Sequence, residues 1–250
     1  MTSPHWDVLV PLKPLRLAKS RLNRVGPGIR EQLARAMSMD TIEAVASCPR
    51  PVRVHVVCDD PCLIGDVRAV ARSARIHRDM PPGLNEALTV AARRLKCTSS
   101  LGTVVVLGDL PALRGADLAQ FLDRAGVVGR AVVADRDGTG STVLAVPAGA
   151  PLDASFGQGS FRRHVSGGAV PVEAAAGLRC DVDQVEDLAF AWRLGLGRRT
   201  ALIAGTATAR ARCVLVDDLG PSCGTSHLDS RSRDPHPGHR PLHEGGERPG

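Results

Sequence analysis

Short apolar, β-branched runs alternate with helical patterns through most of this 250-residue chain. The runs are rich in Val and Leu and lie at four places: residues 7–12, 52–58, 103–107 and 131–134. Runs of this kind are typical of strands buried on both faces of a largely parallel sheet. Amphipathic helical spacing separates them, most clearly after Pro27 and over residues 83–95 and 116–125. The alternation predicts a doubly wound α/β fold.

The pattern changes after Ala134. Residues 138–141 form a glycine-rich turn, and residues 142–146 then predict a returning strand. A second glycine-punctuated loop over 156–160 leads into a short helix, and an acidic helix start follows near Gln184. We expect one folded domain over residues 1–220. Residues 221–250 are dense in Pro, Gly, Ser, His and Arg, so we predict a disordered tail that cannot bury enough apolar surface to fold.

Composition restricts the classes of partner. Aromatic residues make up only 2% of the chain, which argues against stacking on single-stranded nucleic acid. The net charge of +6 belongs to residues 1–220, because four Arg balance four acids in the tail. A surplus of this size suits small polyanions, so we expect no nucleic-acid partner. Seven scattered cysteines and the lack of a signal peptide or membrane-length apolar run predict a reduced, cytoplasmic protein.

Four cations, Lys13, Arg16, Lys19 and Arg21, lie within nine residues directly after the first apolar run. Side chains this close repel one another unless they are solvated or face an anion. A basic loop at the carboxyl end of a strand is where α/β proteins present cations to phosphates. The alternative is a basic surface loop whose charges only keep it soluble.

Three carboxylates stand where a divalent cation could bind. Asp109 follows a central strand and a glycine, a position at which such sheets hold metal ions, although a turn or helix N-cap residue would look the same. Asp181 and Asp183 are two residues apart, so an extended backbone points both carboxylates the same way. Asp183 could instead be the N-cap of the helix near Gln184.

Together these features suit an enzyme that transfers a nucleotidyl group. The cations would hold the departing diphosphate, and the carboxylates would hold Mg²⁺ against the phosphate oxygens. The glycine loops at 138–141 and 157–160 suit backbone cradles for an acceptor's phosphate and carboxylate, although glycine turns are common. His55 and His164 are expected to be packed or surface residues rather than catalysts.

Six segments in order carry a resemblance to a known family: KPLRLAKSRL (13–22), GLNEAL (83–88), LGDLPAL (107–113), ADRDGTGST (134–142), FGQGS (156–160) and LRCDVD (178–183). Over roughly residues 6–210 the chain resembles the 2-phospho-L-lactate / phosphoenolpyruvate guanylyltransferases of coenzyme F420 biosynthesis. The resemblance implies a nucleotidyltransferase fold of the GT-A/Rossmann-like type, an α/β three-layer sandwich with a mostly parallel central sheet. It also implies transfer of GMP from GTP to a phosphorylated three-carbon acid, with diphosphate released.

Carried over position by position, the resemblance implies that Mg²⁺ is held by Asp109, Asp181 and Asp183. Acceptor contacts fall on Ser141, Gly157 and Ser160; some relatives have Thr in place of Ser141, which keeps the hydroxyl. The Lys13–Arg21 loop matches the region that handles the triphosphate, which makes catalytic residues of Lys13, Lys19 and Arg21 and GTP contacts of Lys13, Arg16 and Lys19. Asn85, with Glu86 beside it, is placed near the base or ribose.

The resemblance leaves the acceptor open among phosphoenolpyruvate, 2-phospho-L-lactate and 3-phosphoglycerate, with phosphoenolpyruvate favoured by the Arg-rich composition, and it leaves a homodimer open. An acceptor phosphate is already ionised near neutral pH, so attack on the α-phosphorus of GTP needs no general base. One alternative is a nucleotidyltransferase acting on a sugar phosphate or a molybdopterin-type acceptor, which usually carries a glycine-rich loop before the basic residue. Another is a non-catalytic nucleotide-binding protein, which loss of the three carboxylates would favour.

Overall fold

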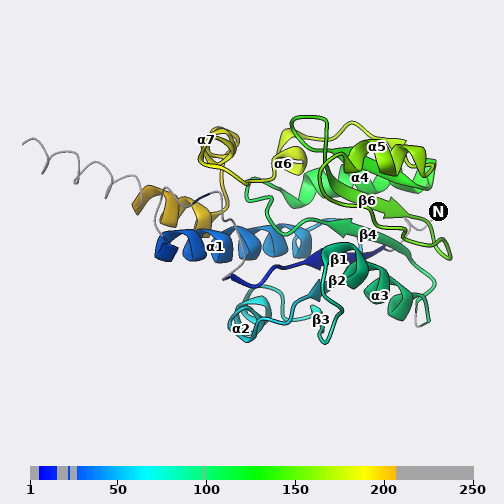
Figure 1. The fold of residues 1–250 in the computed structure, drawn as a ribbon, viewed down its shortest axis with the longest axis horizontal. Helices are drawn as coiled ribbons and strands as arrows, with labels where there is room; N and C mark the ends of the chain where they lie inside the picture. The colour runs from blue at the N-terminus through cyan, green and yellow to red at the C-terminus, as the bar shows by residue number, and fades with distance from the viewer. Residues whose placement is uncertain (1–5, 16–21, 23–26, 98, 207–250) are drawn as a thin grey trace, which may run out of the picture.

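The computed structural model describes residues 6–15, 22, 27–97 and 99–206, and this part of the chain is built on one seven-stranded sheet (Figure 1). The strands follow the order β3-β2-β1-β4-β6-β5-β7 across the sheet. Their bounds are β1 (Trp6–Pro11), β2 (Val52–Val57), β3 (Arg75–His77), β4 (Gly102–Val106), β5 (Ala131–Ala134), β6 (Ser141–Val146) and β7 (Val170–Pro171).

Most neighbouring strands run parallel, and β6 is the exception. Strand β1 pairs in parallel with β2 and β4, while β6 is antiparallel to both of its neighbours, β4 and β5. The reason is local, because only a tight turn joins β5 to β6, closed by a 3.0 Å hydrogen bond from Asp135 N to Gly140 O. A connection this short can only return the chain antiparallel. The prediction of a mostly parallel sheet is confirmed.

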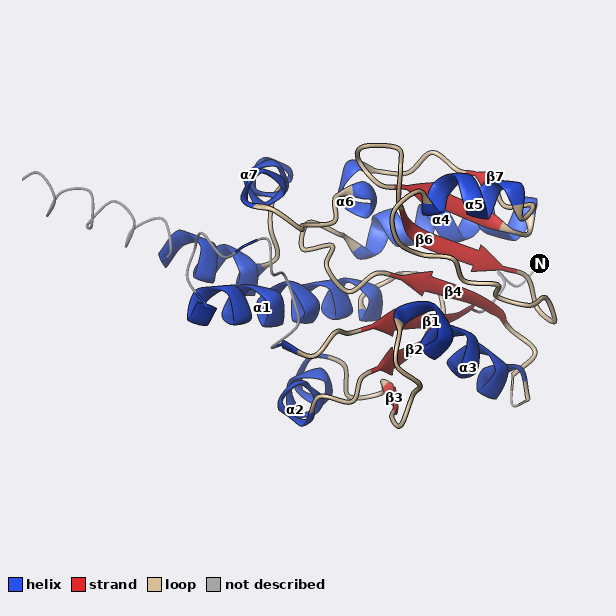
Figure 2. Cartoon of the chain, viewed as in Figure 1, coloured by secondary structure: helices blue, strands red, loops and turns tan. Residues whose placement is uncertain are grey.

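Helices cover both faces of the sheet (Figure 2). They are α1 (Pro27–Ala46), α2 (Pro61–Val70), α3 (Leu84–Lys96), α4 (Gly115–Val128), α5 (Ser160–Ser166), α6 (Ala176–Arg179) and α7 (Val185–Leu194). Alternate residues of β1 face opposite layers. Val8 and Val10 belong to the core under α1, α2 and α4, whereas Leu9 belongs to the core under α3. Continuous apolar strands therefore fill a core on each face, as the sequence predicts.

A third apolar cluster lies beyond the sheet, where α7 and a helical segment over residues 198–206 pack against the first half of α1 (Figure 1). Its buried members include Met37 of α1, Val182 before α7 and Ala204. Asp40 of α1 joins the same region by accepting a 2.7 Å hydrogen bond from Thr200 N. This cluster fixes the segment that carries Asp181 and Asp183.

The other elements match their sequence prediction to within a few residues, whereas α2, β3, α6, β7 and the helical segment over residues 198–206 were not expected. No helix in the described ranges is both long and apolar enough to cross a membrane. The predicted tail over 221–250 lies outside the described residues, as do Arg16, Lys19 and Arg21.

Candidate active site

A cleft of about 540 Å³ opens at the carboxyl-terminal ends of β1 and β4 and beside the start of β6. Seven residues expected from the sequence to act at one site line it together: Lys13, Asp109, Ser141, Gly157, Ser160, Asp181 and Asp183. They come from stretches up to 170 residues apart in the chain. The cleft lies at the edge of the sheet where open α/β folds bind ligands.

Asp109 is held by the tight approach of its turn to β1. A Cβ on Gly108 would lie 2.7 Å from Pro11 O, so only glycine allows the turn after β4 to pass this close. On the other side, Leu110 N donates a 3.0 Å hydrogen bond to Thr41 Oγ1 of α1. Asp109 is not the N-cap of α4, a position held by Arg114.

Asp181 and Asp183 flank a residue whose side chain is completely buried, Val182. The backbone N–H of Val182 donates a 3.1 Å hydrogen bond to Asp109 O, which brings the three acidic residues together. With Val182 pointing into the core, both carboxylates face the cleft, as the two-residue spacing predicts.

The alternative interpretation of Asp183 as a helix N-cap is wrong. The N-cap of α7 is Gln184, in a capping box with Asp187. The Asp187 carboxylate accepts hydrogen bonds from Asp183 N at 3.1 Å and from Gln184 N at 2.9 Å. Because the Asp187 carboxylate caps the helix, the Asp183 carboxylate is not needed as a cap, and Asp183 lines the cleft.

Lys13 is exposed and lines the cleft directly after β1. Its segment is attached to the sheet by a 2.9 Å hydrogen bond from Leu12 N to Val57 O. One turn further, Leu15 N donates to Asp60 Oδ2 at 3.0 Å, while Asp60 Oδ1 caps α2 through Cys62 N. Asp60 therefore fixes the entry to the basic loop.

The two glycine loops meet at the other side of the cleft. The Asp135 carboxylate shapes the first by accepting hydrogen bonds from Thr139 N and Gly140 N. Phe161 N donates to Thr139 O at 3.2 Å and so joins it to the second loop, in which Gly157 adopts a φ of +116° that favours glycine. Ser160 is fully buried, and its Oγ has no hydrogen-bond partner among the described residues.

Asn85 has a structural task in addition to the one implied by the resemblance. Its Nδ2 donates to Phe156 O at 3.0 Å, and its Oδ1 accepts from Phe156 N at 2.7 Å. The side chain thus holds the second glycine loop against α3, and neither Asn85 nor Glu86 lines the cleft, whereas Leu84 does. A contact between Asn85 and GTP stays a prediction.

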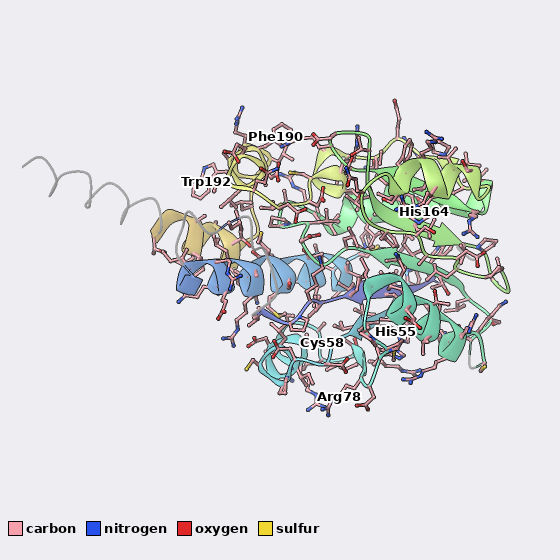
Figure 3. The ribbon with its side chains drawn as sticks, in the orientation of Figure 1. His55, Cys58, Arg78, His164, Phe190 and Trp192 are labelled. Carbon is pink, nitrogen blue, oxygen red and sulfur yellow. The ribbon has the colours of Figure 1, made fainter. Side chains whose placement is uncertain are left out.

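Both histidines discussed above are packed inside the protein (Figure 3). His55 Nε2 lies 3.0 Å from Asp7 Oδ1 and its Nδ1 lies 2.9 Å from His77 Nε2, outside the cleft lining. His164 Nδ1 lies 3.0 Å from Ser141 Oγ, and its Nε2 accepts a 3.0 Å hydrogen bond from Ser155 N. Burial and the nearby charges of Arg130 and Arg163 lower the pKa of His164 to about 4.

Sequence reasoning missed Arg136, the second cationic residue of the cleft lining. Its guanidinium lies 2.8 Å from an Asp187 carboxylate oxygen and 5.1 Å from the centre of the Phe190 ring. Arg136 therefore ties the first glycine loop to the start of α7. The motif ADRDGTGST contains it, but its partner is 51 residues away, so no local pattern marks the pair.

The cleft is rich in acids, since Asp135, Asp137 and Asp187 add to the three predicted carboxylates. Carboxylate oxygens are the ligands that Mg²⁺ prefers, so the donor set fits this metal. In the described ranges, no group of three or more His, Cys, Asp or Glu side chains is placed so that it could hold a metal ion. The donors therefore suit a magnesium ion that takes one or two carboxylates and completes its shell with phosphates and water.

Comparison with known proteins shows the family of this chain. The model of the family described as "Guanylyl transferase CofC like" matches residues 6–188, a range that holds every described cleft residue. The chain belongs to the CofC-like guanylyltransferase family. It is 43% identical over 212 residues to a phosphoenolpyruvate guanylyltransferase of Salinispora arenicola, with 82% of this chain and 96% of that protein covered. A protein of the same name from Thermomonospora curvata is 38% identical, with 80% and 88% covered.

Solved structures confirm the fold of this CofC-like chain. A protein from Desulfovibrio desulfuricans G20 superposes with a TM-score of 0.63 at 17% identity, covering 85% of this chain and 97% of that one. A 4-diphosphocytidyl-2C-methyl-D-erythritol synthase gives a TM-score of 0.55 at 12% identity, covering 76% and 99%. The nucleotidyltransferase-type sandwich implied by the resemblance is therefore confirmed.

Proposed function

We propose that this enzyme transfers GMP from GTP to phosphoenolpyruvate, releases diphosphate and forms a GDP-linked enolpyruvate that serves coenzyme F420 biosynthesis. The curated relatives carry the name of this activity over most of the chain. One observation carries the proposal: a single cleft joins Lys13, three carboxylates and two glycine loops. A sugar-phosphate or molybdopterin-type acceptor is disfavoured, because Lys13-Pro14-Leu15 stands where a glycine-rich loop would precede the basic residue.

We infer that the two substrates bind to different parts of the cleft. Lys13 and the basic loop that follows it would bind the triphosphate, and the opposite loops would bind the acceptor acid. Ser160 offers a buried hydroxyl with no partner among the described residues, and desolvated groups of this kind favour a ligand that completes their hydrogen bonds.

In the reaction, a phosphate oxygen of the acceptor attacks the α-phosphorus of GTP, and the bond to the β-phosphate oxygen breaks as diphosphate leaves. The acceptor oxygen is already ionised, so the chain has to orient and screen two anions rather than remove a proton. Lys13 would offset the charge of the leaving diphosphate.

Asp109, Asp181 and Asp183 are the residues from which Mg²⁺ would take its one or two carboxylate ligands. When bound, Mg²⁺ supplies charge neutralisation at phosphate oxygens and a fixed template for them. The acidic lining also supports a cation, because GTP would otherwise be repelled by the six carboxylates that surround the site.

The test is incubation of the full chain with GTP, Mg²⁺ and one acid at a time, with diphosphate release and the new phosphoanhydride both measured. We expect the highest kcat/KM with phosphoenolpyruvate, lower values with 2-phospho-L-lactate and 3-phosphoglycerate, and loss of turnover when EDTA removes the metal. Release with a sugar phosphate but with none of the three acids would overturn the proposal.

A further inference from the structure

A buried imidazole lies behind the wall of the cleft. His164 of α5, which Figure 3 labels, is 2% exposed, and its neighbour Ser141, the first residue of β6, is 4% exposed. The two side chains come within hydrogen-bonding distance, 3.0 Å between Nδ1 and Oγ. The Phe156 ring packs edge-on against the imidazole, with 5.0 Å between ring centres. Ser141 lines the cleft and His164 does not, so the histidine supports the serine from the protein side.

The second nitrogen of the ring fixes where its proton lies. Nε2 faces the backbone N–H of Ser155 at 3.0 Å, and a backbone N–H can only donate. Nε2 must therefore keep its lone pair, and the neutral ring carries its proton on Nδ1. The low pKa of His164, caused by burial and by Arg130 and Arg163, keeps the ring in this form at neutral pH.

The tautomer in turn fixes the serine. With its proton on Nδ1, His164 donates to Ser141 Oγ, and the serine oxygen accepts. The hydroxyl proton of Ser141 is then directed away from the imidazole, toward the cleft that Ser141 lines.

We propose that His164 is a positioning residue that orients the Ser141 hydroxyl as a donor to an anionic oxygen of the acceptor acid. The identity of the acid rests on the function proposed above. The buried Ser160 Oγ provides a second donor. Ser160 lies on α5, one turn before His164. The hydrogen bond from Phe161 N to Thr139 O couples the loops that carry the two serines. The acid is thus recognised by two buried hydroxyls, and His164 orients the one that belongs to Ser141.

Four variants test the proposal: Ser141→Ala, His164→Gln, His164→Asn and the double variant Ser141→Ala/His164→Gln. An Asn amide nitrogen can take the place of Nδ1 and still donate to Ser141, whereas Gln reaches the place of Nε2. His77→Gln is the matched control, because His77 is a partly buried histidine on the edge strand β3 and lies outside the cleft lining. The readouts are the Kd of phosphoenolpyruvate by calorimetry with Mg²⁺ present, and the KM of each substrate.

We expect Ser141→Ala and His164→Gln each to raise the Kd and KM of phosphoenolpyruvate about 10-fold, with the KM of GTP unchanged. The double variant should be no worse than the poorer single variant, because both remove one contact. For His164→Asn, the Kd and KM of phosphoenolpyruvate should stay within about 3-fold of the values of the unmodified chain. For His77→Gln, both values should equal those of the unmodified chain.

Equal acid affinity in His164→Gln and the unmodified chain would overturn the proposal, as would additive losses in the double variant. Thermal unfolding of each variant separates misfolding from a lost contact. His164→Asn and His164→Gln each lose one buried hydrogen bond, so a loss of stability alone cannot make the two variants differ in their affinity for the acid. An unmodified chain that binds phosphoenolpyruvate but releases no diphosphate contradicts the proposed function alone. Failure to bind the acid contradicts the His164 proposal as well.

Discussion

The backbone N–H of Val182 donates a hydrogen bond of 3.1 Å to the carbonyl oxygen of Asp109. This contact joins the turn after β4 to the segment before α7, two stretches separated by about 70 residues in the chain. It places the side chains of Asp109, Asp181 and Asp183 around one cleft. The acidic half of the site is therefore built by the backbone, and removing one carboxylate should leave the frame in place.

We expect Asp109→Asn to lower kcat by about 100-fold or more, because it removes a charge proposed to hold the metal against the reacting phosphates. The hydrogen bond from Val182 uses the backbone of residue 109, so the thermal unfolding midpoint should change little. Diphosphate release measures the first effect and circular dichroism the second. Asp123→Asn, which removes an exposed carboxylate of α4, is the control. Full activity of Asp109→Asn would refute the metal assignment.

Asp60 offers a way to loosen the basic loop without touching a cation. Asp60→Ala removes both the α2 cap and the bond to Leu15 N, so we expect a loss of about 1 kcal/mol in stability and a several-fold rise in the KM of GTP. Asp60→Ser keeps a capping oxygen for Cys62 N but leaves none for Leu15 N. It should keep most of the stability and still show the raised KM. An equal KM of GTP in the unmodified chain, Asp60→Ala and Asp60→Ser would contradict the role of Asp60 in fixing the loop.

Gly108→Ala should damage both stability and turnover. The added Cβ would meet the Pro11 carbonyl at 2.7 Å, and relief of that overlap must move the turn that carries Asp109. We expect a cost of about 1–3 kcal/mol in the free energy of unfolding, measured by urea titration. Gly65→Ala is the matched control, because its Cβ meets nothing within 4 Å in the middle of α2, and it should stabilise the protein by about 0.5–1 kcal/mol.

The lowered pKa of His164 predicts how stability depends on pH. The folded state holds the ring neutral down to about pH 4, whereas the unfolded chain protonates it near 6.5. Between these values the unfolded state binds more protons, so stability is full above pH 6.5 and falls as the pH drops, by about 3 kcal/mol for this group. Urea titrations from pH 7 to 4 measure the slope. In His164→Gln, the free energy of unfolding should fall less steeply as the pH drops. An unchanged slope would place the proton uptake at another group, for example His77, whose pKa is also lowered.

Features with a local cause could be predicted from the sequence. Asp181 and Asp183 share a direction because an extended backbone alternates its side chains, and Asp109 follows a strand whose apolar run is unmistakable. By contrast, β3 and β7 contain three and two residues, too few to carry a pattern, and only their neighbours in the sheet define them.

Contacts between distant segments could not be predicted, because no local sequence pattern marks them. Asn85 belongs to a motif, but no local pattern shows that its amide binds a backbone 71 residues away. His164 of α5 contacts Ser141 of β6, and no sequence pattern near either residue predicts this contact. The backbone N–H of Ser155 decides the tautomer of the imidazole, and the burial that keeps the ring neutral is not readable from its neighbours in the chain.

The reversed direction of β6 has a consequence for how the substrate range can change. Because β6 starts beside the point where β4 ends, Ser141 and the turn of Asp109 are laterally adjacent, held at a fixed separation by a 3.0 Å bond from Leu107 N to Thr142 O. Under the proposed function, substitutions in the glycine loops can therefore reshape the acceptor side of the cleft for a new three-carbon acid, while the side proposed to bind the nucleotide stays where the sheet puts it. Recognition of the acid and chemistry at the nucleotide are free to evolve separately within one rigid frame.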